Sequence, residues 1–112
     1  MAKFLVLYRS SVSASDQLAG ATPEQVKAGM DAWMEWAQRR GDAVVDLGVP
    51  LGEARRIDPE SVAPSSSQVA GYSILQADSL EGAVELLRDH PHLHTPGDSS
   101  IEVLEFLAMP GM

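Results

Sequence analysis

The sequence contains no cysteine. This absence excludes a disulfide framework, a thiolate zinc site, an iron–sulfur cluster and a cysteine nucleophile. Basic residues are also scarce, because 8 Lys and Arg stand against 16 Asp and Glu and leave a formal net charge of -8. Affinity for nucleic acids and for anionic membranes depends on clustered cations. We therefore expect neither nucleic acid nor a membrane as a partner.

Long hydrophobic runs are missing as well. The longest, Phe4 to Tyr8, is far shorter than the roughly 18 residues of a membrane helix. The N-terminal segment has no apolar core of signal-peptide length, so we expect a soluble cytoplasmic protein. A chain of 112 residues, 45% of them hydrophobic, suits a single domain over residues 1–112 and is too short for a Rossmann or TIM-barrel enzyme. No nucleotide-binding glycine motif is present, and we expect no cofactor.

Periodic hydrophobicity predicts alternating strands and helices. A capping-box pattern at Thr22 begins a long helix, and Gly41 suits its C-terminal cap. A second helix begins at Asp78 or Ser79 and stops before Pro91. Short runs of aliphatic and aromatic residues predict strands over 3–9, 43–49, 69–77 and 100–107. The apolar stripes expected to face the sheet are Val26, Met30, Trp33 and Ala37 in the first helix and Leu80, Ala83, Val84 and Leu87 in the second.

Two β-α-β units in this order predict an α+β fold. The leading candidate is a ferredoxin-like βαββαβ sandwich, in which two helices cover one face of a four-stranded antiparallel sheet. Residues 50–68 form a long connection rich in Pro and Ser, which is typical of a lid, a binding loop or a mobile segment. Glu53–Ile57 is the one part of this connection that suits a short edge strand.

Both faces of the predicted sheet are apolar. In the first strand Phe4, Val6 and Tyr8 point to one face, whereas Leu5 and Leu7 point to the other. Two helices cover only one face, and monomers rarely expose a large apolar patch. A homodimer that packs sheet against sheet is the simplest solution. The alternative is that the 50–68 connection folds back over the second face.

All three histidines lie in one segment, Asp89 to His94. His90 is the candidate catalytic acid or base, because a histidine titrates near neutral pH, and Glu102 is the candidate carboxylate that orients it. A different possibility is that His90, His92 and His94 bind zinc, nickel or copper, although helical metal-ligand spacing is absent. A third is that His90 caps or ends the second helix while the others lie in a solvated loop.

Two tyrosines and a histidine are candidate ligand-binding residues. Tyr8 and Tyr72 lie in predicted strands and can present a hydroxyl into a cavity, with His92 nearby. Packing in the core with a satisfied hydroxyl is the alternative for both tyrosines. The pair Arg55–Arg56 suits either an anionic small molecule or a solvated loop.

Several segments resemble the YCII-related domain family over nearly the whole chain. They are KFLVLYR at residues 3–9, the helix that ends at Gly41, the run from Gly71 to Val84, Pro91 after the second helix, and Ser100 to Pro110. The resemblance implies the ferredoxin-like fold and a dimeric α/β barrel. In the branch of the family associated with catalysis, a His early in the first helix is paired with an Asp just before the Pro that follows the second helix. The first of these positions falls near Met30 in this sequence and the second is His90, so the His–Asp pair itself is absent. Only His90 is carried over as a candidate.

These observations predict a homodimer that binds a small organic molecule. Cofactor-free acid–base chemistry of the lyase type is compatible with the histidine and carboxylates, but the sequence does not decide whether a reaction occurs. A non-catalytic accessory or regulatory module, whose acidic surface binds another protein, is the alternative.

Overall fold

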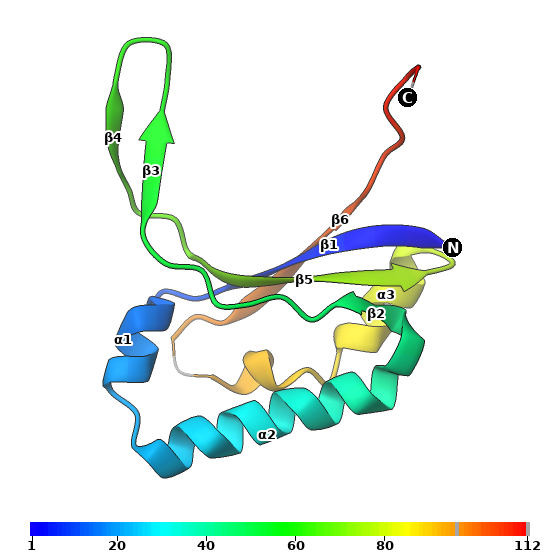
Figure 1. The fold of residues 1–112 in the computed structure, drawn as a ribbon, viewed down its shortest axis with the longest axis horizontal. Helices are drawn as coiled ribbons and strands as arrows, with labels where there is room; N and C mark the ends of the chain where they lie inside the picture. The colour runs from blue at the N-terminus through cyan, green and yellow to red at the C-terminus, as the bar shows by residue number, and fades with distance from the viewer. Residues whose placement is uncertain (96, 112) are drawn as a thin grey trace.

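The computed structural model describes residues 1–95 and 97–111 and contains a four-stranded antiparallel sheet with helices on one side of it (Figure 1). This confirms the predicted α+β class and the single layer of helices. The strand order is β2-β5-β1-β6, so the two longest strands are central. The strands are β1 (Ala2–Arg9), β2 (Val44–Asp46), β5 (Val69–Ala77) and β6 (Ser100–Glu105).

Alternation along β1 determines which side chains form the core. Phe4, Val6 and Tyr8 are buried against the helices, while Leu5 and Leu7 face the other way. Pairing brings Leu5 opposite Ile74 of β5 and Leu104 of β6, so all three lie on the face that no helix covers. Figure 1 shows that face open.

The long helix α2 (Pro23–Arg40) begins as predicted. The Thr22 hydroxyl accepts a hydrogen bond from the Gln25 amide, and the Gln25 side chain accepts one from the Thr22 amide. Its predicted apolar stripe is partly wrong. Met30 is 63% exposed, whereas Trp36, which lay outside the predicted stripe, is fully buried. The first half of the helix is largely exposed, so helical periodicity alone misplaced the buried face.

The second predicted helix is α3 (Leu80–Leu87), and Ser79 is its cap. Ala83 and Leu87 are buried as expected, but Leu80 and Val84 are more than one-third exposed. A short 3-10 turn, η2 (Pro91–His94), follows and leads into β6. The strand β6 ends at Glu105, two residues before the predicted end.

Three local predictions are corrected by the structure. The polar stretch after β1 contains a short helix, α1 (Ala14–Ala19), because Ser13 caps it by accepting a hydrogen bond from the Asp16 amide. The second strand is confined to Val44–Asp46, after the 3-10 turn η1 (Gly41–Ala43). The short strand expected over Glu53–Ile57 is present as β3 (Ala54–Ile57), but it is not an edge strand of the main sheet, because it forms a separate hairpin with β4 (Val62–Ser65).

No helix in the described part of the chain is both long enough and apolar enough to cross a membrane.

Candidate functional site

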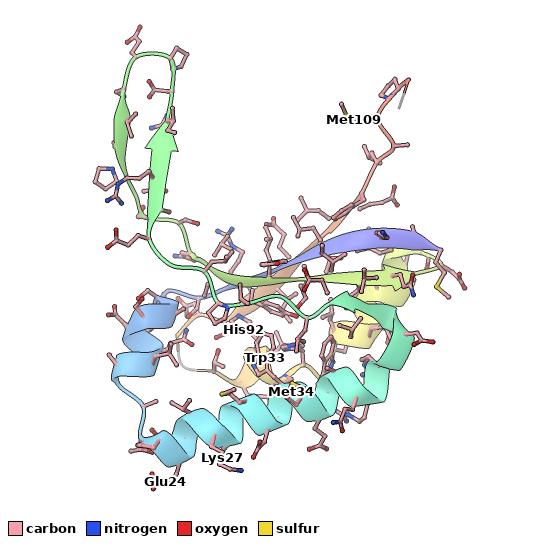
Figure 2. The ribbon with its side chains drawn as sticks, in the orientation of Figure 1. Glu24, Lys27, Trp33, Met34, His92 and Met109 are labelled. Carbon is pink, nitrogen blue, oxygen red and sulfur yellow. The ribbon has the colours of Figure 1, made fainter. Side chains whose placement is uncertain are left out.

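Five aromatic side chains meet between the sheet and α2. We call Tyr8, Trp33, Trp36, His90 and His92 the aromatic cluster. The His90 ring centre lies 4.3 Å from that of Trp33, 4.4 Å from that of Trp36 and 4.8 Å from that of Tyr8. Figure 2 shows Trp33 and His92 in the layer between α2 and the sheet. The cluster joins β1, α2 and the segment after α3, which are far apart in the sequence.

His90 lies at the centre of this cluster and is fully buried. Its Nδ1 accepts a hydrogen bond of 2.9 Å from the His92 amide, so the proton of the neutral ring belongs on Nε2. Nε2 has no hydrogen-bond partner among the described residues. Burial, with a smaller contribution from His92, lowers the pKa of His90 to about 3, against the opposing charge of Asp89. The ring is therefore neutral at physiological pH. This hydrogen bond caps the start of the turn η2, whereas α3 ends at Leu87 with Arg88 as its cap, so His90 does not cap the second helix as the alternative had it.

Two neighbours of His90 are held by hydrogen bonds to the sheet. The Nε2 of His92 donates to the Arg9 carbonyl at 2.8 Å, so His92 is buried and does not lie in a solvated loop. The Tyr8 hydroxyl donates to the Ser73 hydroxyl at 2.8 Å, which in turn donates to the Leu47 carbonyl. Burial raises the pKa of Tyr8 to about 12, despite the opposing hydrogen bond with Ser73. Each of these polar groups is satisfied inside the core.

The remaining candidates, Tyr72 and Glu102, lie on the opposite face of the sheet. Both are cross-strand partners of Leu7, which points to the open face. The Tyr72 hydroxyl donates to an Asp46 carboxylate oxygen at 3.1 Å, and this hydrogen bond raises the pKa of Tyr72. The structure therefore brings Tyr8, His90 and His92 together and separates them from Tyr72 and Glu102 by the thickness of the sheet.

Glu102, the carboxylate predicted to orient His90, and Asp89, the neighbour of His90 in the chain, both lie beside arginines. Glu102 lies 3.9 Å from the Arg9 guanidinium. Asp89 pairs with both Arg39 and Arg40 at the end of α2. Although desolvation raises its pKa, hydrogen bonding and charge from Arg40, with charge from Arg39, bring the pKa of Asp89 below its usual value. The Arg40 Nε also donates to the Leu86 carbonyl at 2.9 Å, so this corner joins α2 to α3.

The histidine segment is curled, but its three imidazoles differ in their exposure to solvent. It forms the 3-10 turn η2, in which His92 is buried and His94 is exposed. Among residues 1–95 and 97–111, no group of three His, Asp or Glu side chains is placed to hold a metal ion.

A groove of about 560 Å³ lies between the segment after β1 and the base of the β3–β4 hairpin. Serines line it from both sides, and we call it the serine groove. Its lining includes Ser11, Ser13, Ser15, Ser65, Ser66 and Ser67, with Leu51, Glu53 and Val69. The sequence placed Ser65, Ser66 and Ser67 in the connection typical of a lid, a binding loop or a mobile segment, and it did not predict a site at the serines that follow β1. The sequence signal for this groove is a pair of serine-rich segments. One segment directly follows the strand predicted over 3–9, and the other directly precedes the strand predicted over 69–77.

Three hydroxyls in the serine groove are held in place by backbone amides. Ser11 accepts from the Asp98 amide at 3.2 Å, Ser13 from the Asp16 amide at 3.1 Å, and Ser67 from the Val69 amide at 3.2 Å. Within the described chain none of these three hydroxyls donates a hydrogen bond to another residue. Since a hydroxyl both accepts and donates, each keeps a hydrogen for a ligand.

A second, smaller groove of about 290 Å³ is apolar. It lies between α3, η2 and β6, and its lining consists of Val84, Leu87, Arg88, Leu93, Ile101 and Val103. Arg88 donates to Glu85 at 2.7 Å, so its guanidinium already has a carboxylate partner. Of these two grooves, the serine groove is therefore the one that offers unused hydrogen-bonding groups.

The chain matches no protein-family model, and no curated protein matches it with the significance expected of a homologue.

Proposed function

We propose that the protein is a homodimer of ferredoxin-like subunits, of the YCII-related type, that binds a small organic molecule in the serine groove. The observation that carries the proposal is the large surface of the single chain. It exposes 7727 Å², whereas a compact monomer of 12.0 kDa exposes about 6,000 Å². The surplus of about 1,700 Å² is the area that one subunit of an obligate homodimer typically buries.

The shape of the chain supports the same proposal. Its radius of gyration is 15.5 Å and its extents are 46 × 45 × 19 Å. A compact domain of this length has a radius of gyration of about 13 Å. The chain is thus flat and broad, and a second copy on the open face of the sheet makes the assembly thicker and more compact.

The open face offers a suitable surface for a second sheet. Its middle row consists of Ile74, Leu5 and Leu104, aligned across three strands. Most polar groups on the same face already have partners, since Tyr72 donates to Asp46, Gln76 donates to the Asp42 carbonyl, and Glu102 lies 3.9 Å from Arg9. Burial of such a face costs little, because few polar groups lose water without a partner.

The serine groove defines the class of ligand. Its free hydroxyl hydrogens are donors, and the donors come from both sides of the groove. We therefore propose a ligand rich in acceptor oxygens, such as a hydroxy acid or a sugar derivative. Because His90 is buried and neutral, binding and not proton transfer by His90 is the function that the geometry favours.

The dimer is tested by light scattering on the parent protein and two variants. Leu5→Lys places a charge in the middle of the open face, and we expect it to convert a dimer of twice 12.0 kDa into a monomer. Leu18→Lys makes the same change on exposed helix α1 and should leave the dimer intact. A parent protein that is monomeric at micromolar concentration would contradict the proposed dimer.

The ligand is tested by a thermal-shift screen with hydroxy acids and sugars. Ligand at about 100 times its dissociation constant stabilises a protein by about 2.7 kcal/mol, which raises the Tm of a chain of this length by about 10 °C. We expect the double variant Ser11→Ala, Ser67→Ala to lose the shift. Ser100→Ala, on exposed strand β6, is the matched control and should keep it. Equal shifts in both variants would place the ligand elsewhere.

A further inference from the structure

The β3–β4 hairpin projects from the body of the molecule on the same side as the open face of the sheet (Figure 1). We call residues 54–65 the arm. Arg55–Ile57 and Val62–Pro64 are exposed at every position. A two-stranded hairpin is at best marginally stable when nothing packs on it. The arm is therefore an element without a packing partner in the single chain.

The pairing register gives the arm two different faces. The pairs Arg55–Pro64 and Ile57–Val62 share one face, since alternate pairs of an antiparallel hairpin point the same way. Ile57 is 76% exposed and Val62 is 67% exposed. The other face carries the pairs Ala54–Ser65 and Arg56–Ala63. The first face is thus the apolar one.

The turn of the arm is preorganised by its own hydrogen bonds. The Asp58 carboxylate accepts from the Glu60 and Ser61 amides, both at 2.9 Å. These backbone hydrogen bonds lower the pKa of Asp58. An ordered turn reduces the entropy lost when the arm packs against another surface.

We infer that the arm packs its Ile57–Val62 face against a second copy of this chain. The inference rests on the proposed dimer and extends its interface from the sheet to the arm. The surplus surface of about 1,700 Å² is the argument for this occupant, because the exposed arm contributes to that surplus and an obligate homodimer removes an area of this size. The arm also stands on the side where the second copy is expected, so one partner covers both surfaces.

Two double variants on the same arm test the inference. Ile57→Thr, Val62→Thr removes apolar surface but keeps β-branched residues, which preserve strand propensity. We expect the dimer dissociation constant, measured by analytical ultracentrifugation, to rise about tenfold. Arg56→Thr, Ala63→Thr changes the same two strands on the opposite face and should leave the constant within about twofold.

Amide hydrogen exchange of the parent protein gives a second readout that requires no variant. Amides of Arg55–Ile57 and Val62–Ala63 should exchange more slowly above the dimer dissociation constant than below it. If the parent is a dimer but arm exchange does not depend on concentration and both double variants dissociate as the parent does, the inference about the arm is wrong and the sheet-to-sheet dimer stands. A monomeric parent overturns both proposals.

Discussion

His90 makes the stability of the protein depend on acid. Its pKa is about 3 in the folded chain and 6.5 in the unfolded chain. Between these values only the unfolded chain takes up the proton, so the free energy of unfolding falls as the pH falls from 6.5 towards 3. We expect His90 to account for a loss of about 2 kcal/mol between about pH 7 and about pH 5. Urea denaturation at several pH values measures this slope.

A variant isolates the contribution of this histidine from that of the carboxylates. His90→Asn keeps an acceptor near the His92 amide but has no imidazole to protonate. It should lower stability at neutral pH and flatten the slope between about pH 7 and about pH 5. His94→Asn, on an exposed neighbour, should keep the parent slope. An unchanged slope in His90→Asn would show that the acid sensitivity has another source.

The two tyrosines should respond differently to the loss of their hydroxyls. Tyr8→Phe leaves the buried Ser73 hydroxyl without its donor and should cost about 1 to 2 kcal/mol of unfolding free energy. Tyr72→Phe removes a hydrogen bond to Asp46 that is exposed in the single chain, so in the Leu5→Lys background, which is expected to be monomeric, it should cost less than about 0.5 kcal/mol. Chemical denaturation of both variants measures the difference. Equal costs would mean that the Tyr8 hydroxyl is not held as the structure describes.

The different surroundings of the tyrosines could not be read from the sequence. Alternation in β1 correctly grouped Tyr8 with Phe4 and Val6. Both faces of this strand are apolar, however, so the pattern did not reveal which face the helices cover. The pairing of Leu7 with Tyr72 then places Tyr72 on the other face, and that register follows from tertiary packing.

At the scale of elements, Gly48 has a conformation that other residues rarely adopt. Its φ is +78°, and a Cβ at this position would lie 1.7 Å from the Tyr72 carbonyl oxygen. Gly48→Ala should therefore displace the segment between β2 and β3 from β5 and cost about 2 to 3 kcal/mol. Gly52→Ala, where a Cβ meets nothing within 4 Å, should cost less than about 0.5 kcal/mol. Thermal or urea denaturation compares the two variants, and similar stabilities would contradict the close approach.

Elements with strong local signals were predicted well, and elements without them were not. The capping box at Thr22 and the strand over Val69–Ala77 appear in the structure as expected. Helix α1 is short and offers few apolar residues, so its sequence resembles a loop. Strand β3 lies within the expected segment Glu53–Ile57, but its partner β4 was not predicted, because it has no alternating buried face that would mark a strand. Hydrophobic periodicity in a sequence marks the buried face of a helix or strand. These elements are mostly exposed, so they have no such pattern.

At the scale of the whole molecule, the sequence predicted an uncovered apolar face and the single chain has one. The hairpin projects beside this face and does not lie over it, which argues against the alternative that the 50–68 connection covers the sheet (Figure 1). The C-terminal segment that carries Met109 also projects on this side (Figure 2). Leu107 and Met109 are exposed there. The serine groove was not predicted, because its two sides come together only through the chain path around β5.

A dimer that unfolds to separate chains has a Tm that depends on protein concentration. Each tenfold rise in concentration favours the dimer by about 1.4 kcal/mol, and the unfolding entropy of two chains of this length converts this free energy into about 3 °C. We therefore expect the Tm of the parent to rise by about 3 °C for each tenfold increase in concentration. The Tm of Leu18→Lys should rise with concentration as that of the parent does. The Tm of Leu5→Lys should be lower and should not change with concentration. Calorimetry over a hundredfold range of concentration measures all three, and a parent Tm independent of concentration would mean that the open face of the sheet remains uncovered in solution.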